Sequence, residues 1–181
     1  MNQLNQLRMV KLNMSDIPDA NVLHEYELRV LRPDEKNKWE LLCDKAFEKV
    51  AHYDFHNEEE SKKGYVADGV IAIFHGDKII ATGTAICNHE QPDGFGYVHN
   101  IAADFDYSGK RLGYEVVAAV LRRLRDDGFD KAELTTDDFR LPAIKTYCSL
   151  GFIPDLSVDE TMRGRWESIY KILGFELSDY I

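Results

Sequence analysis

The pattern of apolar and polar positions predicts a chain in which strands alternate with helices. Alternation over residues 26–31, YELRVL, is typical of a strand, and Pro33 ends it and opens a helix. The apolar residues of that helix share one face and are Trp39, Leu42, Cys43, Ala46, Phe47 and Val50. Two β-rich runs, 69–74 and 78–86, flank a glycine-containing turn at 75–77, and together they predict a hairpin.

The second half of the chain continues this alternation. A strand over 95–103 leads into a loop and then a helix. The inward face of that helix carries Leu112, Val116, Val117, Val120, Leu121 and Leu124. Residues 130–136 predict another strand, and the helix after it accepts Pro142 in its first turn. Residues 152–154 predict a short strand, and the spacing of apolar residues over 162–173 predicts a C-terminal helix.

This order predicts one α/β domain over residues 26–175, with a mixed central β-sheet flanked by helices on both faces and an extra C-terminal helix. Residues 1–25 are polar and contain Pro18. We expect them to form an irregular extension that lies over the domain or is partly disordered. Residues 176–181 form a C-terminal tail.

Charge and cysteine content argue against several partners. The chain has 22 Lys and Arg against 32 Asp and Glu, a net charge of −10, which disfavours nucleic acid. Cys43, Cys87 and Cys148 lie far apart without a CxxC pair, so we expect a reducing compartment and no zinc site. His52 and His56 lack the HExxH pattern and a third ligand, so no metal is predicted. Apolar runs are too short to span a membrane and the N-terminus lacks a signal-peptide pattern, so a cytoplasmic protein without a membrane partner is expected.

The stretch from Val98 to Tyr114 suggests an anion site. A strand, a glycine-containing loop and the start of a helix present unpaired backbone N–H groups and the positive end of the helix dipole. Gly109 and Gly113 let the backbone approach a ligand closely. A phosphate or pyrophosphate is the natural occupant.

Two segments resemble signatures of the GNAT superfamily of acetyl-CoA-dependent N-acetyltransferases. One is IAADFDYSGKRLGYEVVAAVLRRL, which is similar to the family's strand, pyrophosphate loop and helix; the other is LTTDDFRLPAIKTYCSLGF. The similarity extends roughly over residues 26–154. It implies acetyl-CoA as co-substrate and an amine acceptor, either a small molecule or a peptide, and leaves a homodimer open.

The resemblance also implies a set of co-substrate-binding residues. They are Ile101, Ala102, Ala103, Ser108, Gly109, Lys110, Arg111, Leu112, Gly113, Tyr114 and Arg140. Arg111 replaces a family glycine, and it either adds a charge-assisted contact to phosphate or points to solvent. Ser108 also departs from the family loop, and Arg140 stands where many relatives have Asn.

Tyr147 matches the family tyrosine that protonates the departing CoA thiolate; the alternative is a core aromatic. His99 is the candidate base for the amine, because it titrates in the useful range and because arylalkylamine N-acetyltransferases have a histidine at the matching position. The alternative is a hydrogen-bonded strand histidine. Strand alternation would place His99 and Ile101 on the same sheet face. Lesser candidates for the base are Glu133, Asp104 and Asp137.

The expected activity is therefore acetyl transfer by direct attack of an amine in a ternary complex. The alternative is a catalytically silent CoA-binding or regulatory module. The family usually ends with a strand after the short one, where this chain predicts a helix. Part of the acceptor wall is then missing, or it is supplied by residues 1–25 or 52–60.

Overall fold

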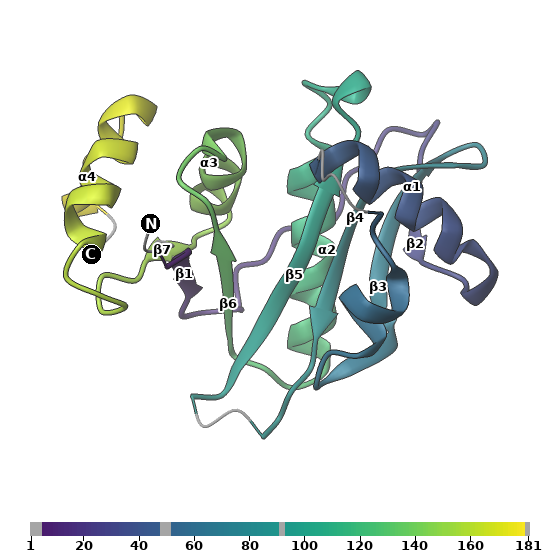
Figure 1. Cartoon of the computed structure of the whole chain (residues 1–181), viewed down its shortest axis with the longest axis horizontal. Coiled ribbons are helices and arrows are strands. Elements are labelled where there is room, and N and C mark those ends of the chain that lie inside the picture. The colour runs from purple at the N-terminus through teal and green to yellow at the C-terminus, as the bar shows by residue number, and fades with distance from the viewer. Residues whose placement is uncertain (1–4, 48–51, 91–92, 180–181) are drawn as a thin grey trace.

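The computed structural model describes residues 5–47, 52–90 and 93–179, which are built on one mixed β-sheet (Figure 1). Its strand order is β2-β3-β4-β5-β6-β1-β7. The strands are β1 (Leu7–Lys11), β2 (Glu27–Val30), β3 (Tyr65–His75), β4 (Lys78–Ile86), β5 (Phe95–Ala103), β6 (Lys131–Thr136) and β7 (Ile153–Pro154). Val50 of the first predicted helix lies outside the described residues, as do residues 1–4 of the extension and 180–181 of the tail.

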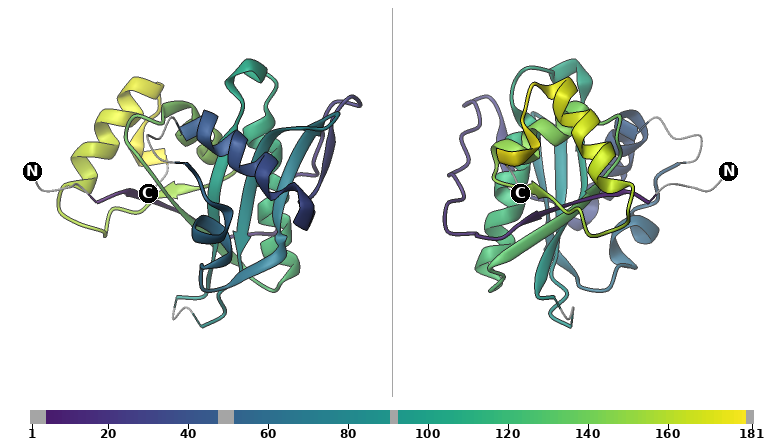
Figure 2. Two further views of the ribbon diagram at one scale, coloured as in Figure 1. Left: turned by 45° about the vertical axis from the view of Figure 1, so that its right-hand side comes forward. Right: turned by 90° about the vertical axis from the view of Figure 1, so that its left-hand side faces the viewer.

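Helices cover both faces of this sheet, as predicted. They are α1 (Lys36–Phe47), α2 (Leu112–Asp126), α3 (Leu141–Ser149) and α4 (Met162–Leu173), with short turns η1 (Pro33–Glu35), η2 (His56–Glu60), η3 (Phe105–Tyr107) and η4 (Leu177–Asp179). Figure 2 shows α1 and α2 on opposite faces of the sheet. The predicted α/β fold with an extra C-terminal helix is confirmed. Within the described residues, no helix has the length and apolarity needed to cross a membrane.

Each face of the sheet packs its own apolar core. The larger core includes Val116 of α2 and Trp166 of α4, both fully buried, and the smaller one lies under α1 around Trp39. Neighbouring positions along a strand serve different cores, since Ile73 belongs to the larger and Phe74 to the smaller. Burying each large apolar side chain contributes about 1.5–3 kcal/mol, so these two cores fix the helices against the sheet.

The N-terminal segment is not irregular throughout. Residues Leu7–Lys11 form β1, which pairs antiparallel with both β6 and β7 and so lies inside the sheet. Leu7 and Met9 are fully buried, and Arg8 reaches Glu133 on β6, with 2.6 Å between Nε and Oε2. The expected irregular extension is therefore wrong for these residues. This segment forms a strand because it pairs with distant strands and because Arg8 meets the opposite charge of Glu133. Its own pattern is too short and too charged to predict a strand locally.

Strands β5 and β6 pair only over part of their length. Their parallel register joins Phe95–Tyr97 to residues 131–133 and stops there, although both strands continue. Figure 1 shows the two arrows meeting at one end and separating toward the other. Past Tyr97 and Glu133 the two strands are therefore separated by a gap.

A bulge in β5 adjoins the same gap. Thr84 pairs with His99 and Thr82 with Ala102, so Asn100 and Ile101 both stand opposite the single residue Gly83. Asn100 takes a left-handed conformation, with φ of 43°. A side chain on Gly83 would have to displace the end of the Ile101 side chain, because a Cβ there would lie too close to Ile101 Cδ1.

The bulge reverses the alternation of side chains along β5. His99 turns toward η2, where its Nε2 lies 3.0 Å from the carbonyl oxygen of Glu58. Ile101 packs instead against the core on the α2 side of the sheet. The expectation that His99 and Ile101 share one sheet face is therefore wrong, because it assumed an uninterrupted strand.

Candidate active site

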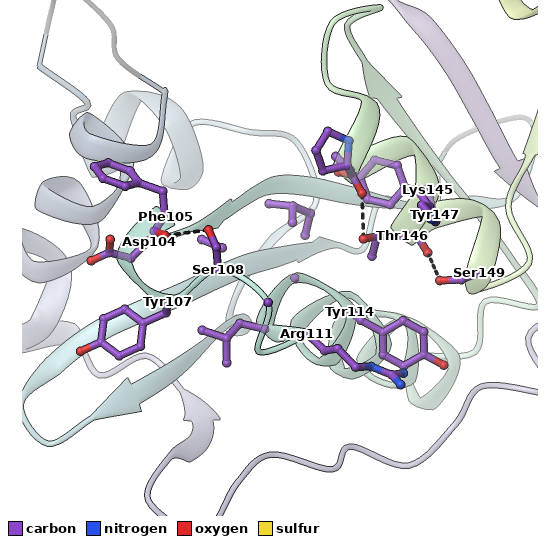
Figure 3. Close-up of a pocket in the computed structure, with 17 residues that line it drawn as sticks. Asp104, Phe105, Tyr107, Ser108, Arg111, Tyr114, Lys145, Thr146, Tyr147 and Ser149 are labelled. Carbon is purple, nitrogen blue, oxygen red and sulfur yellow. Dashed lines mark hydrogen bonds between the residues drawn. The ribbon is translucent and has the colours of Figure 1, made fainter. Parts of the chain in front are cut away.

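A cavity of about 740 Å³ lies between β5, the loop that follows it, the start of α2 and α3 (Figure 3). Among its lining residues are most of those predicted to bind the co-substrate: Ile101, Ala103, Ser108, Gly109, Arg111, Leu112, Gly113 and Tyr114. Ala102 turns its side chain into the core under α1, and Lys110 points toward Tyr26 and Glu25. Arg140 lines a different cavity, described below.

Two residues of the loop before α2 have the left-handed backbone conformation that glycine favours. Gly109 has φ of 80°, and Arg111, which replaces a family glycine, has φ of 58° and ψ of 18°. A left-handed residue with a side chain costs about 1–2 kcal/mol, so the surrounding loop imposes this conformation. No side chain caps the start of α2, and a Cβ added at Gly109 or Gly113 would meet nothing within 4 Å. Within the described part of the chain, the first amides of α2 therefore have no side-chain cap and the nearby loop has room for a ligand, as an anion site requires.

Arg111 lies along the wall of this cavity. Its guanidinium carbon is 4.4 Å from the centre of the Tyr114 ring, and both residues line the cavity. Figure 3 shows the two side chains extending together beside α2. Ser108 makes a local contact, since its hydroxyl donates to the carbonyl oxygen of Phe105 over 2.6 Å.

A second cavity, of about 350 Å³, adjoins the first and shares Ile101 and Tyr147 with it. It lies over the separation of β5 and β6. Its other described lining residues are Gln6, Phe47, Tyr53, Glu58, Tyr97, Val98, His99, Asn100, Leu134, Thr135, Thr136, Asp137 and Arg140. Gln6 comes from residues 1–25, and Tyr53 and Glu58 come from residues 52–60. Both segments that were expected to replace the missing strand therefore contribute to this wall.

Polar side chains from separate segments form a continuous chain along the second cavity. Thr135 bonds the hydroxyl of Tyr97 at 2.8 Å and donates to Gln6 Oε1 at 3.1 Å. The Gln6 amide in turn donates to Asp137 over 3.1 Å. Arg140 Nε donates to the other oxygen of Asp137, also over 3.1 Å. The chain fixes the orientation of all five side chains before any acceptor binds.

His99 lies in the wall of the second cavity. The carbonyl oxygen of Glu58 can only accept, so His99 Nε2 carries the proton and Nδ1 is left as the basic nitrogen. Burial lowers the pKa of His99 below its ordinary value, although the contact with Glu58 opposes this effect. At neutral pH the imidazole is therefore uncharged and able to accept a proton.

Tyr147 on α3 is buried and lines both cavities. Burial raises the pKa of its phenol to about 12, so it stays protonated at neutral pH. The ring packs edge-on against Phe152 with 6.0 Å between centres. Its neighbour Cys148 turns the other way and lies 3.3 Å from the hydroxyl of Tyr170. The helix therefore presents the phenol to the site and directs the thiol into the core.

The lesser candidates for the base have other partners. Glu133 pairs with Arg8 on β1. Asp104 is buried, which alone would raise its pKa, but hydrogen bonds from Lys45 and Lys78 hold it at about 2. Only Asp137 of these three lines the second cavity.

The histidines considered for a metal pair with separate carboxylates. His52 Nδ1 lies 2.5 Å from Asp44, and His56 Nδ1 lies 3.1 Å from Glu60. In the part of the chain that the structure describes, no three His, Cys, Asp or Glu residues are grouped to hold a metal ion.

Sequence reasoning named Asp137 and Arg140 of the polar chain but missed Gln6, Tyr97 and Thr135. Gln6 and Thr135 come together only because β1 pairs with β6. Thr135 and Thr136 were one available signal of a site, because they place two hydroxyls at the end of a predicted strand. The strand before it, over 95–103, leads into the segment that resembles the co-substrate signature. Nothing local indicated that the N-terminus would reach them.

Comparison with known proteins agrees with this geometry. The family model described as acetyltransferase (GNAT) family matches residues 28–152. A mycothiol acetyltransferase from Nocardiopsis dassonvillei is 35% identical over 85 residues, which are 47% of this chain and 25% of the relative.

Solved structures share the fold at low sequence identity. A GCN5-related N-acetyltransferase from Sphaerobacter thermophilus aligns with a TM-score of 0.64 at 13% identity, over 83% of this chain and 50% of that one. The ribosomal-protein-S18-alanine N-acetyltransferase of Escherichia coli aligns with a TM-score of 0.56 at 18% identity, over 70% of this chain and 76% of that one. This chain thus spans a quarter of the curated relative and half of the first of these structures. The family match over residues 28–152 shows that the chain belongs to the acetyltransferase (GNAT) family.

Proposed function

We propose that the protein transfers the acetyl group of acetyl-CoA to the amine of a small polar acceptor by direct attack in a ternary complex. The observation that carries this proposal is the meeting of two cavities at Ile101 and Tyr147, where β5 leaves β6. The larger cavity suits the thioester and the smaller suits the amine. Holding both reactants at once converts a bimolecular step into an effectively unimolecular one.

Residues of the first cavity fit the co-substrate. The uncapped start of α2 faces open space beside Gly109 and Gly113, which suits a pyrophosphate. Arg111 and Lys145 line the same cavity and supply cations. Backbone amides of residues 101–103, next to the gap, would donate to the thioester carbonyl and stabilise the oxyanion that forms.

The second cavity suits a cationic and polar acceptor. Two carboxylates, of Glu58 and Asp137, line it with one guanidinium, of Arg140, so an ammonium group is attracted. Its volume of about 350 Å³ lies at the small end of ligand cavities, which run from about 300 to 1,000 Å³. A small amine or the first residue of a peptide fits this space. The polar chain offers several hydrogen bonds to the rest of the acceptor.

His99 and Tyr147 would move the two protons of the reaction. His99 Nδ1 takes a proton from the ammonium, directly or through a water molecule, and the free amine attacks the acetyl carbon. The new C–N bond forms and the C–S bond breaks. Tyr147 donates a proton to the sulfur as it departs, which avoids releasing a free thiolate, and the second proton that the nitrogen loses as the amide forms restores the phenol through solvent.

We place the protein in a reducing, cytoplasmic compartment, because Cys43, Cys87 and Cys148 are buried thiols that form no disulfide with one another. Burial raises the pKa of the Cys87 thiol to about 12 and also raises that of Cys148. Protonated, buried thiols are poor nucleophiles. A route through an acyl-cysteine is therefore not proposed.

The test is thiol release from acetyl-CoA in the presence of a panel of amines, with mass spectrometry of the product. The panel holds amino sugars, amino acids, polyamines and short peptides. We expect at least one to gain a single acetyl group. The second candidate, a silent CoA-binding module, is favoured by the altered residues Ser108 and Arg111. Tight acetyl-CoA binding in calorimetric titration without turnover of any amine would support that module and refute the enzyme.

A further inference from the structure

The bulge of β5 is held from the side by η2, a π-helical turn from a distant part of the sequence. Two neighbouring residues of the strand bond two neighbouring residues of the turn. His99 Nε2 donates to the carbonyl oxygen of Glu58 over 3.0 Å, and Asn100 Nδ2 donates to Glu59 Oε1 over 2.9 Å. The turn therefore holds the strand by hydrogen bonds to Asn100 in the bulge and to His99 beside it.

Asn100 needs such support. Its φ of 43° lies in the left-handed region, which a residue with a Cβ rarely adopts. Asparagine tolerates this region better than most residues because its amide can hydrogen-bond nearby backbone. Here the amide bonds the Glu59 side chain instead, so the conformation depends on a residue outside the strand.

Glu59 is an unusual residue to find in this position. It is fully buried, with 0% of its surface exposed, and it lines neither cavity. Burial raises its pKa to about 7, although the hydrogen bond from Asn100 opposes the rise. The charged groups that act on it are Lys62, which favours the carboxylate, and Glu58, which disfavours it. A buried carboxyl is costly, and an apolar residue would fill the same space at less cost.

The bulge that Glu59 supports shapes the reaction centre. It turns His99 toward the second cavity and Ile101 toward α2, and it lies beside the gap between β5 and β6. Without it, regular alternation would turn these side chains to one face and shift the amides of residues 101–103.

We propose that Glu59 is a positioning residue for acetyl transfer: by bonding Asn100, it holds the left-handed bulge that presents His99 and the amides of 101–103 to the reactants. This inference rests on the proposed function. Glu59 touches neither reactant in this account. Its effect passes through the backbone at Asn100, and that is the feature to test.

The experiment compares Glu59→Leu with the double variant Glu59→Leu/Asn100→Gly. We expect Glu59→Leu to lower kcat by about 10-fold, because the left-handed conformation loses its support, while acetyl-CoA affinity changes little. Glycine adopts that conformation freely and has no amide left to satisfy. The double variant should therefore recover most of the lost kcat. Glu59→Gln keeps an accepting oxygen for Asn100 and should stay close to the wild type.

A matched control variant and a second measurement distinguish a positioning role of Glu59 from a general loss of stability. Glu35 is also buried and bonds Arg29, away from both cavities, so Glu35→Leu should lower Tm and leave kcat unchanged. Hydrogen exchange of the β5 amides should accelerate in Glu59→Leu and slow again in the double variant.

Three outcomes would overturn the inference. They are unchanged exchange in Glu59→Leu, wild-type kcat in Glu59→Leu, and a double variant that folds but is not restored. A wild-type protein that turns over no amine would instead refute the proposed function, and the exchange experiment would still decide the role of Glu59.

Discussion

Arg111 allows backbone strain and charge to be separated at one position. Its left-handed backbone, with φ of 58°, suits glycine, and Arg111 lines the cavity that we propose for the co-substrate. Arg111→Gly removes the charge and relieves the strain. Arg111→Ala removes the charge and keeps the strain, because alanine has a Cβ. Comparing the two variants isolates each effect.

The magnitudes follow from the local geometry. Relief of the left-handed strain is worth about 1–2 kcal/mol. Two losses offset it in the glycine variant: backbone entropy of about 0.5–1 kcal/mol, and a cation–π contact to Tyr114 worth about 0.5–1 kcal/mol. The free energy of unfolding of the glycine variant should therefore lie within about 1 kcal/mol of that of the wild type, which corresponds to a shift in Tm of roughly 2–4 °C at most. The alanine variant should be less stable than the glycine variant by about 1 kcal/mol.

Affinity for acetyl-CoA gives the second result. A hydrogen bond to a charged group is worth about 1.5–3 kcal/mol, so loss of the guanidinium should weaken binding about 10-fold or more. We expect the same loss in both variants, measured by calorimetric titration alongside thermal unfolding. Wild-type affinity in both variants would show that Arg111 faces solvent when acetyl-CoA binds. A loss in the alanine variant alone would show that loop conformation matters and charge does not.

Three further predictions test the reaction centre. Tyr147→Phe keeps the ring against Phe152 and should lower kcat about 100-fold at unchanged acetyl-CoA affinity; equal kcat would remove Tyr147 from the mechanism. Burial holds the pKa of His99 below 6.5, so kcat should fall as pH drops through that lower value and His99 gains a proton. In His99→Gln, this fall of kcat at low pH should disappear. A fall that persists in the variant would show that another group causes it. Asp137→Asn should raise the KM of the amine about 10-fold without changing that of acetyl-CoA, because a charged hydrogen-bond partner is lost, whereas the exposed Asp126→Asn should change neither.

Local periodicity was enough to predict most helices and strands. The apolar face of α2 and the turn residues around it specify a helix without reference to the rest of the chain. The same holds for α4, where Met162 and Trp166 are buried as their spacing predicts. These elements depend on neighbours three or four residues away, and that information lies within a short window of sequence.

Two features could not be predicted because they depend on distant partners. Residues Leu7–Lys11 become a strand only by pairing with β6 and β7, which come more than a hundred residues later. The bulge at Asn100 interrupts an otherwise regular strand, and its partner Glu59 lies in another element. Assuming period-two alternation through that point placed His99 and Ile101 on one face, and one extra residue was enough to separate them.

The two halves of the site differ in the same way, and the difference bears on how specificity can change. The half that we propose for the co-substrate comes largely from the continuous segment 101–114, so its signature is readable in sequence. The half that we propose for the acceptor joins residues of three separate segments, which are Gln6, Glu58 and the pair Thr135 and Asp137. In this proposal, substitutions at these positions can alter which amine binds without disturbing the loop that would hold the pyrophosphate. For that reason family membership indicates acetyl transfer, whereas the acceptor of this chain must be argued from its own second cavity.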